Sequence, residues 1–125
     1  MLKVLLLLLP LTLLAQEPQY EMTNYVVGFL SRGPKWSAEL TDESKKLQEG
    51  HMKNIQRMAD LKKLIVAGPF RGNDDLRGIL IFQEGVTLDE AKELVAPDPA
   101  VKAGRLDLKL MTWFAAKGLK INPPK

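Results

Sequence analysis

The chain has 125 residues, of which 46% are hydrophobic, so it can bury the core of one compact domain and is too short for two. Its 18 basic and 15 acidic residues are interspersed and leave a formal charge of +3, without the basic stripe of a protein that binds nucleic acid. The absence of cysteine excludes disulfides, a thiolate nucleophile and a lipid-modified N-terminal cysteine.

Residues 1–15 have the three parts of a secretory signal peptide. Lys3 supplies a positive start, residues 4–14 are apolar, and Ala15 precedes a polar sequence. The apolar stretch is shorter than the roughly 20 residues that cross a bilayer, and Pro10 interrupts it, which argues against a permanent membrane anchor. We expect cleavage near Ala15 and export, either to a periplasm or out of the cell.

The remaining chain predicts a flexible lead-in at 16–23, one domain at 24–115 and a loose tail at 116–125. Within the domain, alternating or continuous apolar runs predict strands, and apolar residues at helical spacing predict helices. In chain order, the expected elements are a strand at 24–30, a helix opening near Thr41, strands at 64–69 and 78–84, a helix at 88–95, a helical turn at 99–103 and a strand at 105–114. This β-α-β-β-α-β order is typical of a ferredoxin-like α+β sandwich, in which both helices cover one face of a four-stranded antiparallel sheet.

The three helical segments have recognisable starts. Thr41 is an expected N-cap, and Thr87 and Glu90 have capping-box spacing. Asp98 before Pro99 predicts an N-cap with proline in the first helical position. An aspartate in this role accepts a backbone N–H from one of the two residues after the proline.

The other face of the predicted sheet is left uncovered. The first strand is apolar on both faces, with Tyr25, Val27 and Phe29 on one and Val26 and Leu30 on the other. The third strand repeats this pattern, so we expect the open face to pack against another sheet. A two-fold homodimer that closes into a shared barrel is the simplest arrangement that buries it.

His51 is the only histidine, and it lies on the apolar face of the first helix between Leu47 and Ile55. A buried imidazole needs hydrogen-bond partners, because an unpaired polar group costs about 1 to 3 kcal/mol. Two roles are open on the residues alone. A structural histidine bonded to a backbone carbonyl is the commoner one, whereas a carboxylate on one ring nitrogen would leave the other free to exchange a proton.

Six segments, in order over residues 24–114, resemble the YCII-related family: "FLSRGPKW", "GHMKNIQRMAD", "KLIVAGPF", "RGILIF", "LVAPDPAVKAGRL" and a last strand ending in Trp113. The resemblance implies a dimeric α+β barrel with an active site built from His51 and Asp98. Most members have no assigned substrate, and a related member is a dehydrochlorinase of a hydroxylated chloroaromatic ring. Lys62 and Lys63 depart from the family, which tends to place a glycine at the end of this helix, and Thr112 replaces a common proline.

Further residues are candidates for a substrate pocket above the His51–Asp98 pair. Arginine binds carboxylates and phenolates, and indole stacks on rings, which favours Arg32, Trp36, Arg71 and Trp113 as contacts. The alternative is that the loop arginines are solvated and that Trp113 packs in the core.

The sequence predicts neither a metal nor an organic cofactor. A single histidine without cysteine leaves a zinc site dependent on carboxylates and excludes a two-histidine iron site within one chain. No dinucleotide-binding fingerprint is present, and the "RGNDD" loop lacks phosphate-loop spacing. The signal sequence, the open sheet face and the family resemblance together predict an exported, dimeric, cofactor-independent enzyme of the lyase or isomerase type. It would use a His51–Asp98 acid/base dyad on a small molecule. The alternative is a non-catalytic ligand-binding or structural module.

Overall fold

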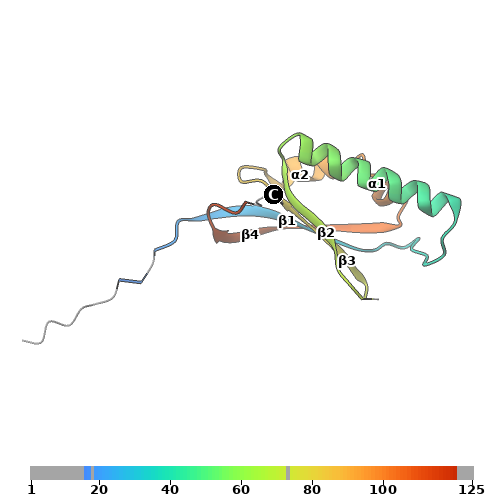
Figure 1. Cartoon of the computed structure of the whole chain (residues 1–125), viewed down its shortest axis with the longest axis horizontal. Coiled ribbons are helices and arrows are strands. Elements are labelled where there is room, and N and C mark those ends of the chain that lie inside the picture. The colour runs from blue at the N-terminus through green and yellow to red at the C-terminus, as the bar shows by residue number, and fades with distance from the viewer. Residues whose placement is uncertain (1–15, 18, 73, 121–125) are drawn as a thin grey trace, which may run out of the picture.

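Figure 1 shows the computed structural model, which describes residues 16–17, 19–72 and 74–120. The expected signal peptide lies outside these residues, as does the end of the expected tail. Within the described part of the chain, no helix is long and apolar enough to cross a membrane.

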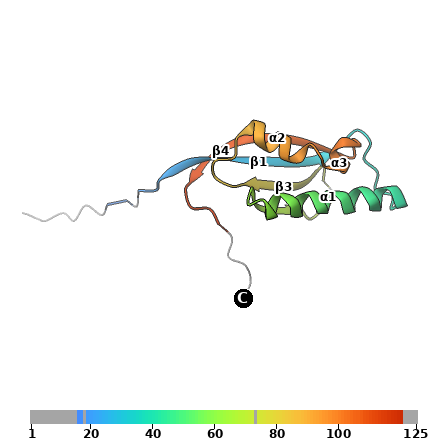
Figure 2. The ribbon, with the colours of Figure 1, turned by 90° about the horizontal axis from the view of Figure 1, so that it is seen from above.

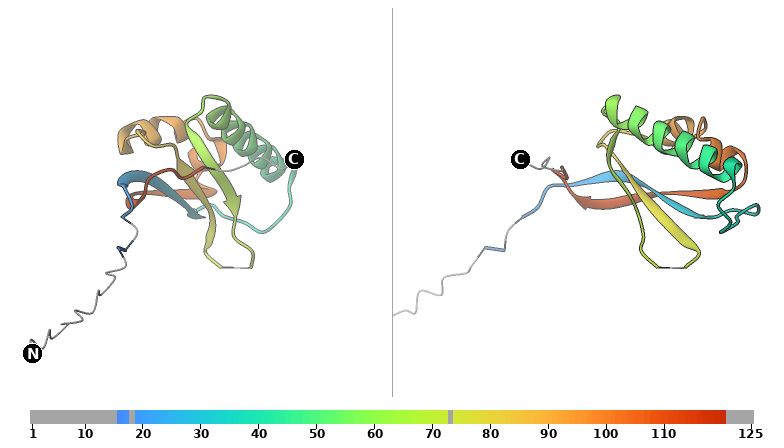
Figure 3. Two further views of the ribbon diagram at one scale, coloured as in Figure 1. Left: turned by 60° about the vertical axis from the view of Figure 1, so that its left-hand side comes forward. Right: turned by 45° about the vertical axis from the view of Figure 1, so that its right-hand side comes forward.

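Four antiparallel strands form one sheet in the order β2-β3-β1-β4. The strands are β1 (Met22–Arg32), β2 (Leu64–Pro69), β3 (Leu76–Phe82) and β4 (Leu106–Ala116). The helices are α1 (Asp42–Asp60), α2 (Leu88–Val95) and the short α3 (Pro99–Lys102). All three cover the same face of the sheet, and the opposite face is open (Figures 1 and 3). The predicted ferredoxin-like α+β sandwich is therefore confirmed.

The two longest strands extend beyond their predicted bounds. β1 and β4 pair continuously from Met22 opposite Ala116 to Arg32 opposite Leu106. Part of the expected lead-in and the first residue of the expected tail therefore belong to the sheet, since each strand satisfies the other's backbone groups along its whole length. Seen from above, this pair and the α2 helix lie beside β3 and α1 (Figure 2).

Residues just after β4 are also held in place. The backbone N–H groups of Gly118 and Leu119 both donate to Tyr25 Oη at 3.1 Å, and the Lys117 N–H donates to the Glu21 carbonyl oxygen. The side chain of Lys117 donates to the Glu21 carboxylate, which raises the pKa of Lys117. These bonds fold the first part of the expected loose tail back onto β1.

The core lies between the helices and the covered face of the sheet. Alternate residues of β1 and β3 point into it, as the period of a strand requires, and apolar positions of the helices meet them. Its buried members are Val26, Leu30, Met58, Leu64, Leu80, Phe82, Val86, Ala91, Val95, Ala100 and Leu106.

Helix α1 begins where the sequence predicts, and a strained residue follows its C-cap. The Thr41 side chain accepts from the Ser44 N–H at 3.0 Å, while Ser44 Oγ accepts from the Thr41 N–H at 2.9 Å, which closes a capping box. At the other end Lys62 has a φ of 60°, in the left-handed region that favours glycine. Leu61 is the C-cap and is half exposed.

Helix α2 begins at its predicted cap, with Thr87 Oγ1 accepting from the Glu90 N–H at 3.1 Å. The Glu90 carboxylate binds Lys63 Nζ at 2.7 Å instead of completing the predicted capping box. This ion pair joins the start of α2 to the segment that follows α1.

Candidate active site

The first element of the site is the apolar face of α1. His51 lies on this face between Leu47 and Ile55 and is 8% exposed. The residue therefore occupies a position where most helices place an aliphatic side chain, and its ring is removed from bulk water. A polar ring in such a position needs a hydrogen-bond partner.

Asp98 supplies that partner from the turn between α2 and α3. As the N-cap of α3, its Oδ1 accepts from the Ala100 N–H at 2.9 Å and from the Val101 N–H at 3.4 Å. Its own N–H donates to the Val95 carbonyl oxygen, and the residue is only 1% exposed. The predicted capping role is confirmed, and it holds the carboxylate in one orientation.

His51 Nδ1 and Asp98 Oδ2 are 2.5 Å apart, so the contact predicted across 47 residues is present. Because a carboxylate accepts, the hydrogen-bond network assigns the shared proton to Nδ1. Within the described residues Nε2 has no hydrogen-bond partner, and in the neutral ring it carries the lone pair. The carboxylate thus fixes the tautomer in which Nε2 can accept a proton.

A glycine in α1 makes this contact possible. A Cβ on Gly50 would overlap Pro99 Cγ, because their separation would be less than 3.0 Å, a distance within which real Cβ atoms essentially never have a neighbour. Glycine inside a helix costs about 1 kcal/mol relative to alanine. Here it lets α3 approach α1 closely enough for Asp98, next to Pro99, to reach His51.

His51 opens on a cavity of about 340 Å³ between α1 and the covered face of the sheet. This lies within the range of small-molecule sites, about 300 to 1,000 Å³. Met52 and Ile55 of α1 and Leu80 of β3 form apolar walls, and Gln48 adds a polar group. The site therefore combines a proton-transfer group with a largely apolar space for a small ligand.

The structure brings two of the four other predicted contacts to this region. Trp36 lines the cavity together with His51. The guanidinium of Arg32 lies over the Trp36 ring, with Cζ 5.4 Å from the ring centroid.

Arg71 and Trp113 do not line the cavity, contrary to our expectation. Arg71 is exposed in the β2–β3 loop, and this hairpin extends away from the helices (Figure 3). Trp113 lies on the open face of the sheet, 6.1 Å from Tyr25 by ring centroids. In β4 the side chain of Leu110 packs against the core, so strand alternation turns the residue three positions later to the opposite face.

Two arginines that the sequence did not single out lie beside Trp36. Arg77 lines the cavity, with its Cζ 5.1 Å from the ring centroid, and Arg105 Cζ lies 4.6 Å from the same point. Strand alternation would place Arg77 on the open face, but Leu30 pairs with Gly78 and the next residue of β1 pairs with Leu76. Arg77 is thus the extra residue of a β-bulge, which redirects its side chain. A bulge leaves no local sequence signal here.

Comparison with known proteins bears on the fold. No family model and no curated protein matches the chain. Among solved structures it is similar to 5-chloro-2-hydroxyhydroquinone dehydrochlorinase from Burkholderia phenoliruptrix AC1100, determined in complex with 2,5-dihydroxybenzoquinone. The TM-score is 0.50 at 21% sequence identity, over 71% of this chain and 92% of that chain. At this identity the similarity shows a shared fold.

Proposed function

We propose that the protein is a small-molecule enzyme in which His51 and Asp98 act as a general acid/base dyad. The observation that carries this proposal is the 2.5 Å contact between His51 Nδ1 and Asp98 Oδ2 beside a cavity that His51 itself lines. A structural histidine would be satisfied by such a bond equally well. The open cavity at His51, and the absence of any partner for Nε2 among the described residues, favour the catalytic role.

The step that this geometry supports is proton abstraction from carbon. Nε2 of His51 takes a proton from a C–H bond of the substrate, and the electron pair of that bond forms a C=C double bond as a leaving group departs from the adjacent carbon with its own pair. In an isomerisation the proton returns to a different carbon instead. Asp98 stabilises the imidazolium that forms by accepting the Nδ1–H bond throughout.

Two lines of support favour elimination. The chain shares its fold with a protein described as a dehydrochlorinase, whose structure holds a dihydroxybenzoquinone. The six segments of the sequence that resemble the YCII-related family include both dyad residues, which supports assignment to that family. No step in this chemistry requires a metal or an organic cofactor.

The proposal also concerns where the protein acts and in what form. The composition of residues 1–15 supports export, to a periplasm or out of the cell. The open face of the sheet supports a homodimer, because Phe29, Ile79 and Ile81 lie on it beside Met111 and Trp113, and the last two are 45% and 44% exposed. A second copy of the same face would bury this apolar surface.

Carbon–hydrogen exchange tests the function with any small molecule that the cavity binds, whether or not it is the natural substrate. Small acids and phenols, including 2,5-dihydroxybenzoquinone, are screened by thermal shift, and each hit is incubated with the protein in D₂O and followed by proton NMR. We expect catalysed exchange that falls by about 100-fold or more in His51→Asn. Asp98→Asn should have a similar effect, because an amide N–H facing Nδ1 favours the tautomer with the proton on Nε2.

The matched control is Lys46→Gln, an exposed position of α1 away from the cavity, which should exchange like the unmodified protein. Circular dichroism checks that each variant is folded. Hits that bind but show no exchange, or exchange that is unaffected in folded His51→Asn, would assign the chain to the class of non-catalytic ligand-binding modules.

A further inference from the structure

The ring of Trp36 lies at one wall of the cavity with three guanidinium groups around it. The Cζ atoms of Arg32, Arg77 and Arg105 are 5.4, 5.1 and 4.6 Å from its centroid. One cation over an indole is a common stabilising contact. Three like charges around one ring repel one another, so a negative charge bound beside them would stabilise the arrangement.

The backbone accounts for how this cluster is assembled. The Gly33 N–H donates to the Arg105 carbonyl oxygen and the Lys35 N–H to the Gly104 carbonyl oxygen, both at 2.9 Å. A Cβ on Gly33 would overlap Gly104, so only glycine allows the two segments to come this close. This contact brings Trp36 beside Arg105, while the β-bulge turns Arg77 toward the same ring.

Two of these arginines are bonded to backbone carbonyl oxygens. Within the described residues, neither Arg77 nor Arg105 forms an ion pair with a carboxylate. Arg77 Nη1 donates to the carbonyl oxygen of Asp74 at 3.2 Å, and Arg105 Nη1 donates to the carbonyl oxygen of Ser37 at 2.8 Å. Each guanidinium has five N–H donors, so these carbonyl bonds leave most of them available.

The two charges also act together. Because both Cζ atoms lie close to one centroid, they are less than about 10 Å apart, which is the Debye length at about 0.1 M salt. A planar oxyanion can accept two parallel N–H bonds from a guanidinium, and such pairs are among the strongest hydrogen bonds in proteins. The arginines therefore provide a site for a delocalised anion such as a carboxylate or a phenolate.

We infer that Arg77, which lines the cavity, and Arg105, which lines a separate hollow but reaches the same Trp36 ring, form an anion clamp. The clamp binds the oxyanion of a small organic substrate at the Trp36 end of the cavity while the reacting carbon of the substrate faces His51. This inference rests on the proposed function in that it takes the cavity as the substrate site. It adds the chemical class of the substrate, a small organic anion. The volume of about 340 Å³ suits a single substituted ring, since a cavity of about 150 Å³ already holds benzene.

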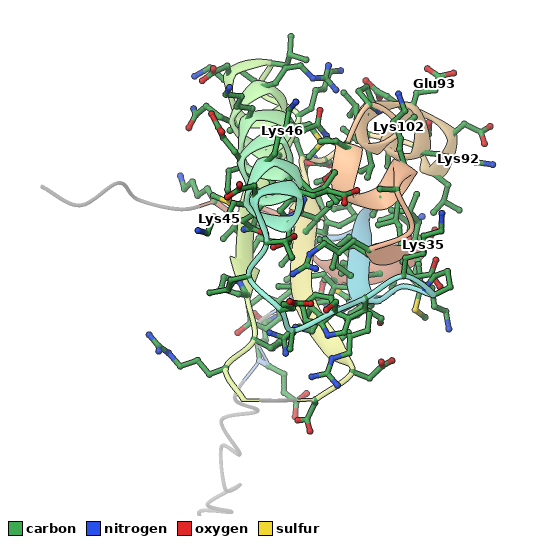
Figure 4. The ribbon with its side chains drawn as sticks, turned by 90° about the vertical axis from the view of Figure 1, so that its right-hand side faces the viewer. Lys35, Lys45, Lys46, Lys92, Glu93 and Lys102 are labelled. Carbon is green, nitrogen blue, oxygen red and sulfur yellow. The ribbon has the colours of Figure 1, made fainter. Side chains whose placement is uncertain are left out.

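The lysines at the same end of the molecule are not part of the clamp. Figure 4 shows Lys35, Lys45, Lys46 and Lys102 extending outward from the loop, α1 and α3, and all are exposed. None of them lines the cavity. They are the ordinary solvated surface, and they offer controls for the effect of charge alone.

The test compares two probes that share a ring and differ in charge, 4-hydroxybenzoate and 4-hydroxybenzamide. Isothermal titration calorimetry measures both affinities for the full chain. The chain has two tryptophans, so Trp113→Phe leaves Trp36 as the sole indole, and quenching of its fluorescence places the bound probe. We expect the benzoate to bind more tightly than the benzamide and to quench Trp36.

Arg77→Gln and Arg105→Gln should each weaken benzoate binding by about tenfold or more and should weaken benzamide binding much less. Lys46→Gln removes one charge from the same end and should have little effect. Equal affinity for the two probes, no benzoate binding at millimolar concentration, or an equal loss in Lys46→Gln would overturn the clamp.

Failure of the clamp can be distinguished from failure of the proposed function. The clamp is read from charge-selective affinity, whereas the dyad is read from exchange of a ligand C–H bond. His51→Asn should therefore retain the preference for benzoate. Charge selectivity without exchange would keep the clamp and reject the catalysis, and exchange without charge selectivity would do the reverse.

Discussion

Replacing Gly50 by alanine adds one methyl group between α1 and α3. The new Cβ would overlap Pro99 Cγ, whereas carbon atoms in contact prefer a separation of about 3.5 to 4.0 Å. Relief of the overlap requires α3 to move by roughly 1 Å. Since Asp98 directly precedes Pro99, the same movement lengthens its 2.5 Å bond to His51 to about 3.5 Å, beyond the usual limit of about 3.2 Å.

The expected change in stability follows from opposing contributions. Alanine is favoured over glycine inside a helix by about 1 kcal/mol. Overpacking costs about 1 to 3 kcal/mol, and weakening a charge-assisted hydrogen bond costs about 1.5 kcal/mol more. We therefore expect Gly50→Ala to lower the free energy of unfolding by about 2 kcal/mol, although helix propensity alone predicts an increase.

Urea denaturation measures this free energy, and nitrogen NMR of labelled histidine measures the dyad. The chain has one histidine, so both ring-nitrogen signals come from His51, and only Nδ1 and Nε2 have to be told apart. We expect the Nδ1–H signal to lose the character of a strong hydrogen bond in Gly50→Ala and to keep it in the exposed control Lys46→Ala. An increase in stability together with an unchanged Nδ1–H signal would refute the argument that this glycine positions the dyad.

Two further predictions concern the open face and the end of α1. Light scattering should give twice the mass of one chain for the unmodified protein. Ile79→Lys places a charge on the open face and should give the mass of one chain. An unmodified protein that is monomeric would reject the homodimer. Lys62→Gly should raise the free energy of unfolding by about 0.5 to 1 kcal/mol, because glycine adopts the φ of 60° without strain. Lys46→Gly, inside α1, should lower it by about 1 kcal/mol in the same urea titration, and equal losses in the two variants would contradict the strain at Lys62.

Several features of the site could be predicted because they depend on neighbours within a few residues. The N-cap at Thr41 is bonded to Ser44, and the position of His51 on the apolar face follows from the helical period. Asp98 before Pro99 forms its cap with the next backbone N–H groups. The order of strands and helices then limited the topology enough to predict the fold.

Only the tertiary structure decided which side chains share the cavity. A one-residue bulge turned Arg77 toward Trp36, alternation along β4 placed Trp113 on the opposite face, and the β2–β3 hairpin carried Arg71 away from the helices. Arg105 reached Trp36 through backbone bonds between segments about 70 residues apart. Helix caps and the spacing of apolar residues depend on short stretches of sequence, so they can be predicted from them. The contacts in the cavity depend on strand register and on the close approach of backbone segments that are distant in the chain, and no short stretch of residues encodes these.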